Sequence, residues 1–400
     1  MNHKIANTFF LLILFPLFLS LKIDNVHHST ECNSSIGLLT PIPTCSPVNI
    51  CKNPLITYRL QGRKKIIESS DIPNCKTKWK ITKKNFVGCI QGGRGVFDDG
   101  KAKLWKDPYG INRYWCEFRP NQVLENSKRP LVIYVPGSGG SADNIYDFTL
   151  LRKKAVDFDL TGDTKRKGFI LVSVQGRNLH WPTDDAQDGS KHDSYHRNLA
   201  TNPDVVFFDY LIDYFVNDLK IADPGQIYIT GWSNGARFAS FYGINRNTVA
   251  TSGGNKVTAV AVYSGGDPFE NTSPNQIPSC KQDTYPQSNL FYLLISRDCD
   301  LIACNQQQFD LFKQSGWHMT PGNQATTWIN DLKYKMKNNN TSWLIIDSNG
   351  QRKNKCLGHT QCNKKNALKN HFCWPDGISD ESGIDYEIEL LNFLKKNQLR

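Results

Sequence analysis

Short apolar runs recur along the chain from residue 131 to residue 347, and helix-like stretches separate them. The intervals between the runs suit a parallel sheet, in which each strand is followed by a helix. The pattern predicts strands at Leu131–Val135, Phe169–Val174, Ile227–Thr230, Val257–Tyr263, Leu290–Ile295 and Trp343–Asp347.

The clearest helical pattern covers residues 204 to 219. Asn202 and Pro203 supply a cap and a proline at the first turn, and the apolar positions that follow form one stripe. Residues 386 to 396 are predicted to form the last helix of the domain. Strands that alternate with helices in this order predict an α/β fold with a mostly parallel, doubly wound sheet.

The main domain is expected to span residues 112–400 and to open with an edge strand at 113–120. Residues 22–111 are rich in cysteine, lysine and proline, and we interpret them as a disulfide-rich extension. Residues 1–21 resemble a signal peptide, because Lys4 precedes an apolar run that is short for a membrane span. The alternative is an uncleaved anchor; otherwise the chain is expected to be secreted and extracellular, with no stable membrane insertion.

Twelve cysteines all follow the apolar start of the chain. An even number of cysteines in an exported chain predicts disulfides. The sequence does not fix their pairing, although Cys299 with Cys304 would close the simplest local loop. Acceptor motifs for N-glycosylation, which suit the same secretory route, occur at Asn33, Asn271, Asn339 and Asn340.

The net charge of +11 comes from scattered basic residues, so we expect a solvated surface and no nucleic-acid partner. A weak attraction to acidic cell-wall polymers fits this charge. His192 and His196 stand four positions apart, but no third ligand follows at a useful spacing. We therefore expect no metal and no cofactor.

A candidate nucleophile lies between the predicted strand at 227–230 and a helix-like stretch. The residues from Gly231 to Gly235 form a G-x-S-x-G pentapeptide with Ser233 at its centre. A sharp strand-to-helix turn exposes such a serine, and a side chain at either glycine would collide with the tight backbone. The alternative is an ordinary glycine-rich turn.

A serine hydrolase also needs donors for the carbonyl oxygen that becomes negative. Glycines follow the strand at 131–135, where backbone N–H groups can point at a ligand. We expect an oxyanion hole at the N–H groups of Ser138 and Asn234. A plain glycine turn is the alternative.

The acid and the base should follow the nucleophile. Asp300 lies in the loop after the strand at 290–295, with Asp298 as the alternative. His371 precedes the last helix and is preferred as the base over His359, which lies in a lysine- and asparagine-rich segment. The resulting order Ser, Asp, His is that of α/β-hydrolases.

These motifs resemble secreted α/β-hydrolases of the group that includes feruloyl esterases, acetylxylan esterases and polyhydroxybutyrate depolymerases. The resemblance covers roughly residues 114 to 394. Two departures stand out: Pro136 replaces the family's histidine in the oxyanion strand, and Ser296-Arg297 replaces its His-Gly. The matching segments are Val135–Ala142, Asp204–Phe207, Asp223–Gly235 and His371–Pro375.

The resemblance implies ester hydrolysis through a Ser233, His371 and Asp300 triad, on acylated polysaccharide, feruloyl-type or polyester substrates. Trp181, which follows a strand, would stack on the substrate or lie in the core. A catalytically silent binding or adhesion protein is the alternative function. A peptidase of the same fold is weaker, because no repeat predicts the propeller that such enzymes carry.

Overall fold

The computed structural model describes residues 96–97, 103–108, 110, 112–120, 127–137, 140–176, 181, 199, 202–269, 285–314, 324–347, 349–356, 362–378 and 382–399. The predicted signal peptide and most of the predicted extension lie outside these residues. So do Asn33, Asn271, His192, His196 and His359, together with Ser138.

The described residues form a ten-stranded sheet with the order β1-β3-β5-β4-β6-β7-β8-β9-β10, and β2 pairs with β3. The strands from β5 to β9 are parallel to one another, whereas β3 and β10 run antiparallel to their neighbours. The bounds are β1 (Val96–Phe97), β2 (Lys103–Lys106), β3 (Asn112–Pro120), β4 (Arg129–Val135), β5 (Ile170–Val174), β6 (Ala222–Trp232), β7 (Ala259–Tyr263), β8 (Phe291–Arg297), β9 (Thr341–Ile346) and β10 (Arg352–Lys353). The predicted doubly wound, mostly parallel sheet is confirmed.

The position of β3 differs from the prediction. It is not an edge strand, because β5 pairs with one side of it and β1 and β2 pair with the other. Both added strands precede residue 112. The sheet therefore begins within the segment that the sequence assigned to the extension.

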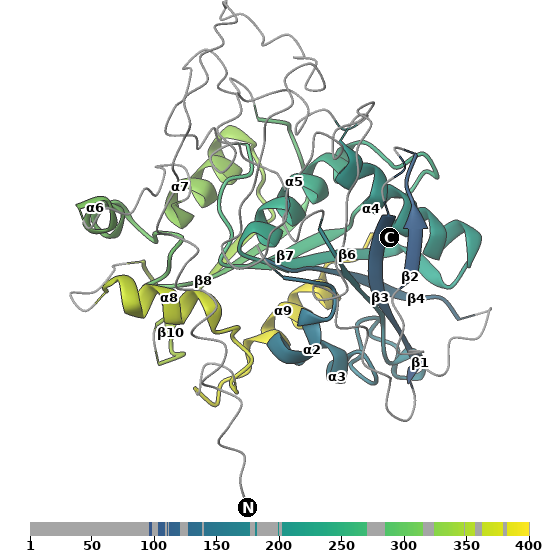
Figure 1. Cartoon of the computed structure of the whole chain (residues 1–400), viewed down its shortest axis with the longest axis horizontal. Helices are drawn as coiled ribbons and strands as arrows, with labels where there is room; N and C mark the ends of the chain where they lie inside the picture. The colour runs from purple at the N-terminus through teal and green to yellow at the C-terminus, as the bar shows by residue number, and fades with distance from the viewer. Residues whose placement is uncertain are drawn as a thin grey trace, which may run out of the picture.

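Helices cover both faces of the sheet (Figure 1). One face packs against α4 (Pro203–Asp213), α5 (Asn234–Thr248) and α7 (Ala325–Asn330), and the other against α2 (Asn144–Phe148), α3 (Leu151–Lys154) and α9 (Tyr386–Lys396). Successive side chains of β4 pack alternately on the two faces of the sheet. Ile133 packs in the core with α4 and α5, and Val132 packs with α9. Burial on both faces explains why these strands are apolar throughout.

The predicted helices lie where the sequence placed them. The stretch at 204–219 is α4 followed by a π-helical turn, η7 (Tyr214–Asp218), and the closing helix is α9. Asn202 caps α4 by accepting hydrogen bonds from two backbone N–H groups. The remaining helical segments are η5 (Thr164–Arg166), α6 (Gln306–Gln314), η10 (Asp331–Lys335) and α8 (Lys364–Phe372).

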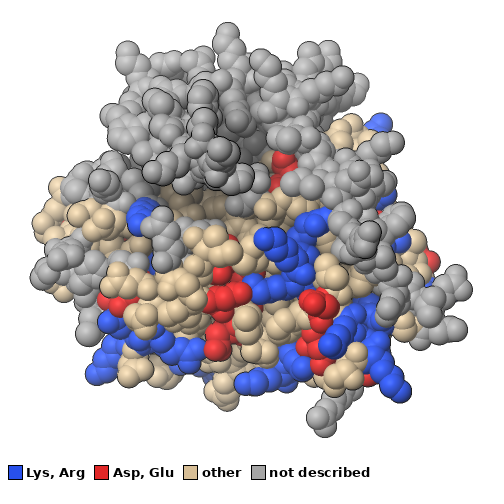
Figure 2. Space-filling view, turned by 90° about the horizontal axis from the view of Figure 1, so that it is seen from below, with Lys and Arg blue, Asp and Glu red and all other residues tan. Residues whose placement is uncertain are grey.

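The surface seen from below mixes charges of both signs (Figure 2). Ion pairs tie α3 and α9 to their surroundings, as between Lys154 and Asp385 and between Lys395 and Asp159. Where side chains are described on this face, no broad patch of one sign forms. Among the described residues, no helix has the length and hydrophobicity needed to cross a bilayer.

Candidate active site

Ser233 lies on a tight turn between β6 and α5. Its φ of 56° and ψ of −124° are unusual for a residue with a side chain, so the turn is strained. A Cβ at Gly235 would come within 2.2 Å of the Val135 carbonyl oxygen, and one at Gly231 within 2.8 Å of the same atom. Glycine at both positions thus lets the turn pack against the end of β4, which leaves Ser233 partly exposed.

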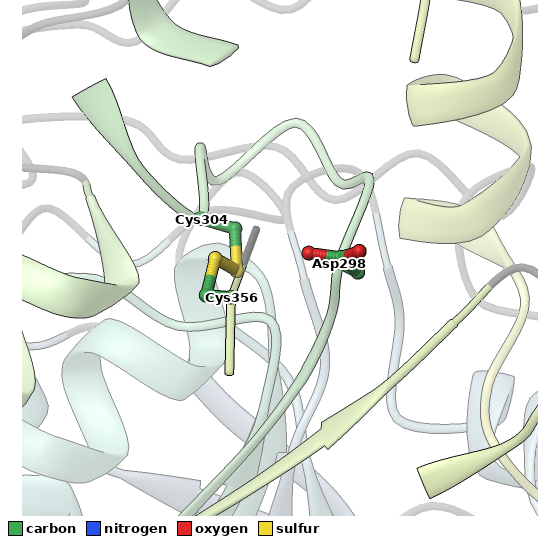
Figure 3. A group of neighbouring side chains, drawn as sticks. All are labelled: Asp298, Cys304 and Cys356. Atoms are coloured by element: carbon green, nitrogen blue, oxygen red, sulfur yellow. A yellow bond between two sulfur atoms is a disulfide. The ribbon is translucent and has the colours of Figure 1, made fainter. Parts of the chain in front are cut away.

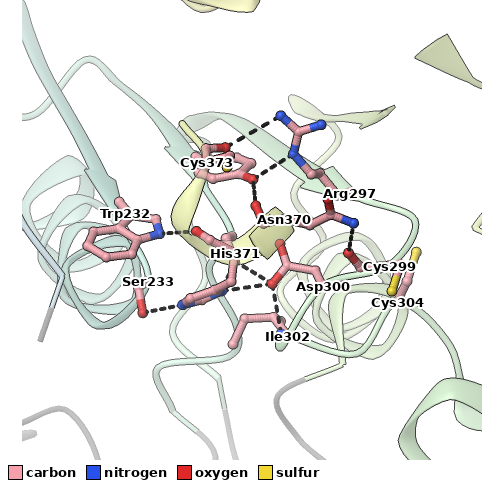
Figure 4. Close-up of polar contacts among 12 residues, drawn as sticks. Trp232, Ser233, Arg297, Cys299, Asp300, Ile302, Cys304, Asn370, His371 and Cys373 are labelled. Carbon is pink, nitrogen blue, oxygen red and sulfur yellow. Dashed lines mark hydrogen bonds and ion pairs between the residues drawn. The ribbon is translucent and has the colours of Figure 1, made fainter. Parts of the chain in front are cut away.

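A line of hydrogen bonds joins Ser233 to a histidine and a carboxylate (Figure 4). His371 Nε2 lies 2.8 Å from Ser233 Oγ, and His371 Nδ1 lies 2.8 Å from Asp300 Oδ1. Asp300 is completely buried, and His371 is nearly so. The structure thus brings Asp300, rather than Asp298, to the imidazole.

The first turn of α5 faces the same site. Asn234 is the first residue of this helix, where backbone N–H groups have no partner within the helix and can bind an anion. Its side chain is already used: Oδ1 accepts from the Trp181 N–H and Nδ2 donates to the Trp181 carbonyl, each at 2.7 Å. The side chain is therefore held against Trp181, and the backbone N–H is the oxyanion donor that the sequence predicts.

The central strands lie parallel in the order given above, and a strained serine turn follows β6. Asp300 and His371 come later in the chain, in the order serine, carboxylate, histidine. The chain has the α/β-hydrolase fold. Each functional side chain of this fold lies near the carboxyl end of a strand, where the loops are free to vary.

Neither a family model nor a curated protein sequence matches the chain. Among solved structures, a thermostable esterase is 15% identical with a TM-score of 0.43, over 74% of this chain and 62% of that protein. An acetyl xylan esterase from Aspergillus awamori is 14% identical with a TM-score of 0.34, over 50% of this chain and 74% of its own. Prolyl oligopeptidase B from Galerina marginata is 13% identical with a TM-score of 0.39, over 76% of this chain and 38% of its own. The matched region therefore spans less than two thirds of the first and third of these proteins.

The helix that carries His371 is fixed at its carboxyl end by donors from the sheet. The Trp232 indole N–H donates to the His371 carbonyl at 2.7 Å, and the Tyr263 hydroxyl donates to the Asn370 carbonyl. Arg297 donates to the Tyr263 hydroxyl at 3.0 Å. The last carbonyls of a helix lack partners within it, so these bonds both satisfy and orient the end of α8.

Burial raises the pKa of Tyr263 far above its ordinary value, so its hydroxyl stays protonated and can donate at neutral pH. The sequence did not reveal this support. The available signal was that Trp232 and Tyr263 each end a strand at the edge that carries Ser233.

Trp181 lies in the core and not on the surface. Its side chain is completely buried, with its ring stacked on Phe238 at a centroid distance of 5.1 Å. Its indole N–H donates to the Pro136 carbonyl at 2.9 Å. Of the two interpretations of Trp181, the structure favours the core residue, because a ring enclosed in this way offers no face to a substrate.

The simplest disulfide expectation, Cys299 with Cys304, is wrong. Cys299 pairs with Cys362, and Cys304 pairs with Cys356. The loop after β8 turns toward the amino end of α8, which brings distant cysteines next to it. The first bridge therefore joins the residue before Asp300 to the residue two positions before the helix that carries His371.

Asp298, Cys304 and Cys356 form the group of described side chains that comes nearest to a metal site (Figure 3). Their candidate ligand atoms lie within 4.8 Å of one another. Both sulfur atoms belong to one disulfide, however, and a metal ligand must be a thiolate. This donor set does not fit a metal while the bridge is intact.

Proposed function

We propose that this protein is a secreted serine carboxylesterase in which Ser233 is the nucleophile, His371 the base and Asp300 the acid. One observation carries the proposal: the continuous hydrogen-bonded line from the Ser233 hydroxyl through His371 to Asp300. A nucleophile, a base and a group that orients the base, each within hydrogen-bond reach of the next, are the pattern of an activated serine.

The proposed reaction proceeds through an acyl-enzyme. His371 Nε2 takes the hydroxyl proton as Ser233 Oγ attacks the ester carbonyl carbon. The Asn234 backbone N–H, with that of Ser138, stabilises the negative oxygen of the tetrahedral intermediate. The intermediate collapses, and the alcohol leaves with the proton from His371. Water then attacks the acyl group with the same base, and Ser233 recovers its proton.

Secretion belongs to the same proposal. Disulfides persist in oxidising compartments, and both described bridges lie beside the candidate site. Residues 1–21 would act as the signal peptide and residues 22–111 as the extension before the hydrolase domain. The resemblance of the motifs suggests acylated polysaccharide, feruloyl-type or polyester substrates.

The test uses a fluorophosphonate probe on the secreted full-length protein, followed by peptide mapping. The probe reacts with an activated serine whatever the natural substrate. We expect label on Ser233, and loss of label in Ser233→Ala and His371→Ala. Ser240→Ala, which removes a buried hydroxyl in the middle of α5, serves as the matched control and keeps its label. Folded wild-type protein without label would instead support the silent binding protein.

A panel of substrates then separates an esterase from a peptidase. We expect turnover of acetyl, feruloyl or hydroxyalkanoate esters, and much slower turnover of amides with the same acyl groups. Preference for the amides would assign the protein to the peptidases of this fold.

A further inference from the structure

Ser264 is a buried serine that none of the sequence motifs singled out. It follows β7 at the same edge of the sheet as Ser233, and its side chain is completely buried. Its φ of 54° lies in the left-handed region, which residues with a side chain seldom adopt. Its N–H donates to the Ile295 carbonyl at 2.9 Å, so β8 helps to hold this conformation. Such strained residues cluster at functional sites.

The hydroxyl of Ser264 completes a triangle with the acid and the base. Ser264 Oγ lies 2.8 Å from Asp300 Oδ1 and 2.7 Å from His371 Nδ1, two atoms that are themselves 2.8 Å apart. We propose that Ser264 is a positioning residue, which holds His371 in the tautomer and orientation that the triad requires. This inference rests on the proposed function.

Hydrogen-bond chemistry determines which way the hydroxyl points. Nε2 can accept the Ser233 proton only if Nδ1 carries the ring hydrogen. A carboxylate accepts and cannot donate. The Ser264 hydroxyl therefore donates its hydrogen to Asp300, and its lone pair faces the Nδ1–H. The ring hydrogen thus lies between two acceptors, which restrains the imidazole from both sides.

The tautomer of His371 with its hydrogen on Nε2 is disfavoured, because it removes hydrogen bonds from Asp300. With the hydrogen on Nε2, the Ser264 hydroxyl would turn to donate to Nδ1. Asp300 Oδ1 would then lose the donors from both His371 and Ser264 and keep the Ile302 N–H at 3.0 Å. Asp300 Oδ2 has no hydrogen-bond partner among the described residues. A buried carboxylate short of donors is costly, so Ser264 couples the charge of Asp300 to the tautomer of His371.

The test compares Ser264→Ala with Ser240→Ala. Ser240 is the matched control, because its hydroxyl is also completely buried and bonded, to the Ala236 carbonyl and the Tyr292 hydroxyl, but not to the triad. Ser264→Gly is the second variant, since glycine tolerates the positive φ and guards against a folding failure. The readouts are kcat/KM on an activated ester and the His371 Nδ1–H resonance in protein with ¹⁵N-labelled histidine.

We expect kcat/KM to fall by about 10- to 100-fold in both Ser264 variants, the size of one hydrogen bond to a charged group. The Nδ1–H resonance should shift and exchange faster with water. Ser240→Ala should leave both readouts unchanged. An unchanged rate and an unchanged resonance in both Ser264 variants would overturn the inference while the esterase proposal stands. If the wild-type protein hydrolyses no ester, the resonance alone decides the role of Ser264.

Discussion

Asp300 is completely buried, and within the part of the chain that the structure describes only its Oδ1 atom accepts hydrogen bonds. The donors are the His371 ring, the Ser264 hydroxyl and the Ile302 N–H. These bonds compensate the loss of water around the charge. An amide at the same position would present N–H donors to the ring and favour the opposite tautomer.

Replacement of Asp300, the proposed acid, gives the first prediction. Asp300→Asn should lower kcat/KM on an activated ester by about 10³- to 10⁴-fold with little change in fold. Asp298→Asn is the matched control, because Asp298 is buried in the same loop, while the carboxylate hydrogen-bonded to His371 is that of Asp300. Its kcat/KM should stay within a few-fold of wild type. A large loss in Asp298→Asn, with Asp300→Asn active, would move the acid to Asp298.

The overlapping acceptor motifs at Asn339 and Asn340 give a second prediction at this scale. Asn339 is exposed, whereas the Asn340 side-chain nitrogen, the atom that would carry the glycan, donates to the Asn289 carbonyl at 2.9 Å. In protein secreted from a eukaryotic host, Asn339→Gln should remove one glycan by mass spectrometry. Asn340→Gln leaves the Asn339 motif intact and should not. Glycan at Asn340 alone would contradict this assignment.

At the scale of elements, α8 is the part of the fold on which the site depends. The Cys299–Cys362 bridge holds its amino end, and hydrogen bonds from Trp232 and Tyr263 hold its carboxyl end. The Asn370 side chain also donates to the Cys299 carbonyl at 2.6 Å. These contacts tie the helix to the loop that carries Asp300 and so hold His371 beside Asp300.

Removing the two described disulfides separately tests this coupling. The pairs span 63 and 52 residues, so the loop-closure relation gives a similar loss of stability for each, about 4 kcal/mol. Cys299→Ala with Cys362→Ala should also lower kcat/KM by about 10- to 100-fold, because it frees the triad geometry. Cys304→Ala with Cys356→Ala should keep most of the activity. The measurements are urea unfolding and ester kinetics below the unfolding transition. Equal losses of kcat/KM in the two double variants would contradict the coupling between α8 and the Asp300 loop.

The sequence predicted the strands from β3 to β9, α4 and α9, and the fold class, because continuous apolar runs and helix caps are local signals, but it did not predict β1, β2 or β10. It also proposed Ser233, Asp300 and His371 as site residues, since a strand-to-helix pentapeptide and chain order suffice for that. The role of Ser264 and the Cys299–Cys362 pairing carry no local signal, and the place of Trp232 at a strand end does not show that it supports α8. Their roles follow from strands and loops that meet only in the folded chain.

At the scale of the whole molecule, tyrosine hydroxyls are enclosed within the layers that flank the sheet. Burial raises the pKa of Tyr292 to about 12, and it also raises the pKa values of Tyr134, Tyr228, Tyr242 and Tyr263 above the ordinary value of a tyrosine. An unfolded tyrosine has a pKa of about 10. These groups therefore contribute stability that is complete below pH 10. It is lost as pH rises through the folded pKa, because the unfolded chain ionises first.

Tyr134 allows the pH-dependent stability from a single buried tyrosine to be measured. Its hydroxyl is buried against Trp374 and has no hydrogen-bond partner among the described residues, so Tyr134→Phe removes an uncompensated polar atom. We expect Tyr134→Phe to be more stable than wild type by about 1 kcal/mol at pH 8. Between pH 10 and pH 11 it should lose about 1 kcal/mol less than wild type, because the unfolded Tyr134 goes from about half to about nine-tenths ionised over this range while the folded one stays protonated. Tyr334→Phe is the control, since Tyr334 is 76% exposed and should change neither quantity.

Urea unfolding at fixed pH values measures both effects. An alkaline slope that is identical in wild type and Tyr134→Phe would mean that Tyr134 ionises equally in the folded and unfolded chains, and thus that water reaches this layer of the core.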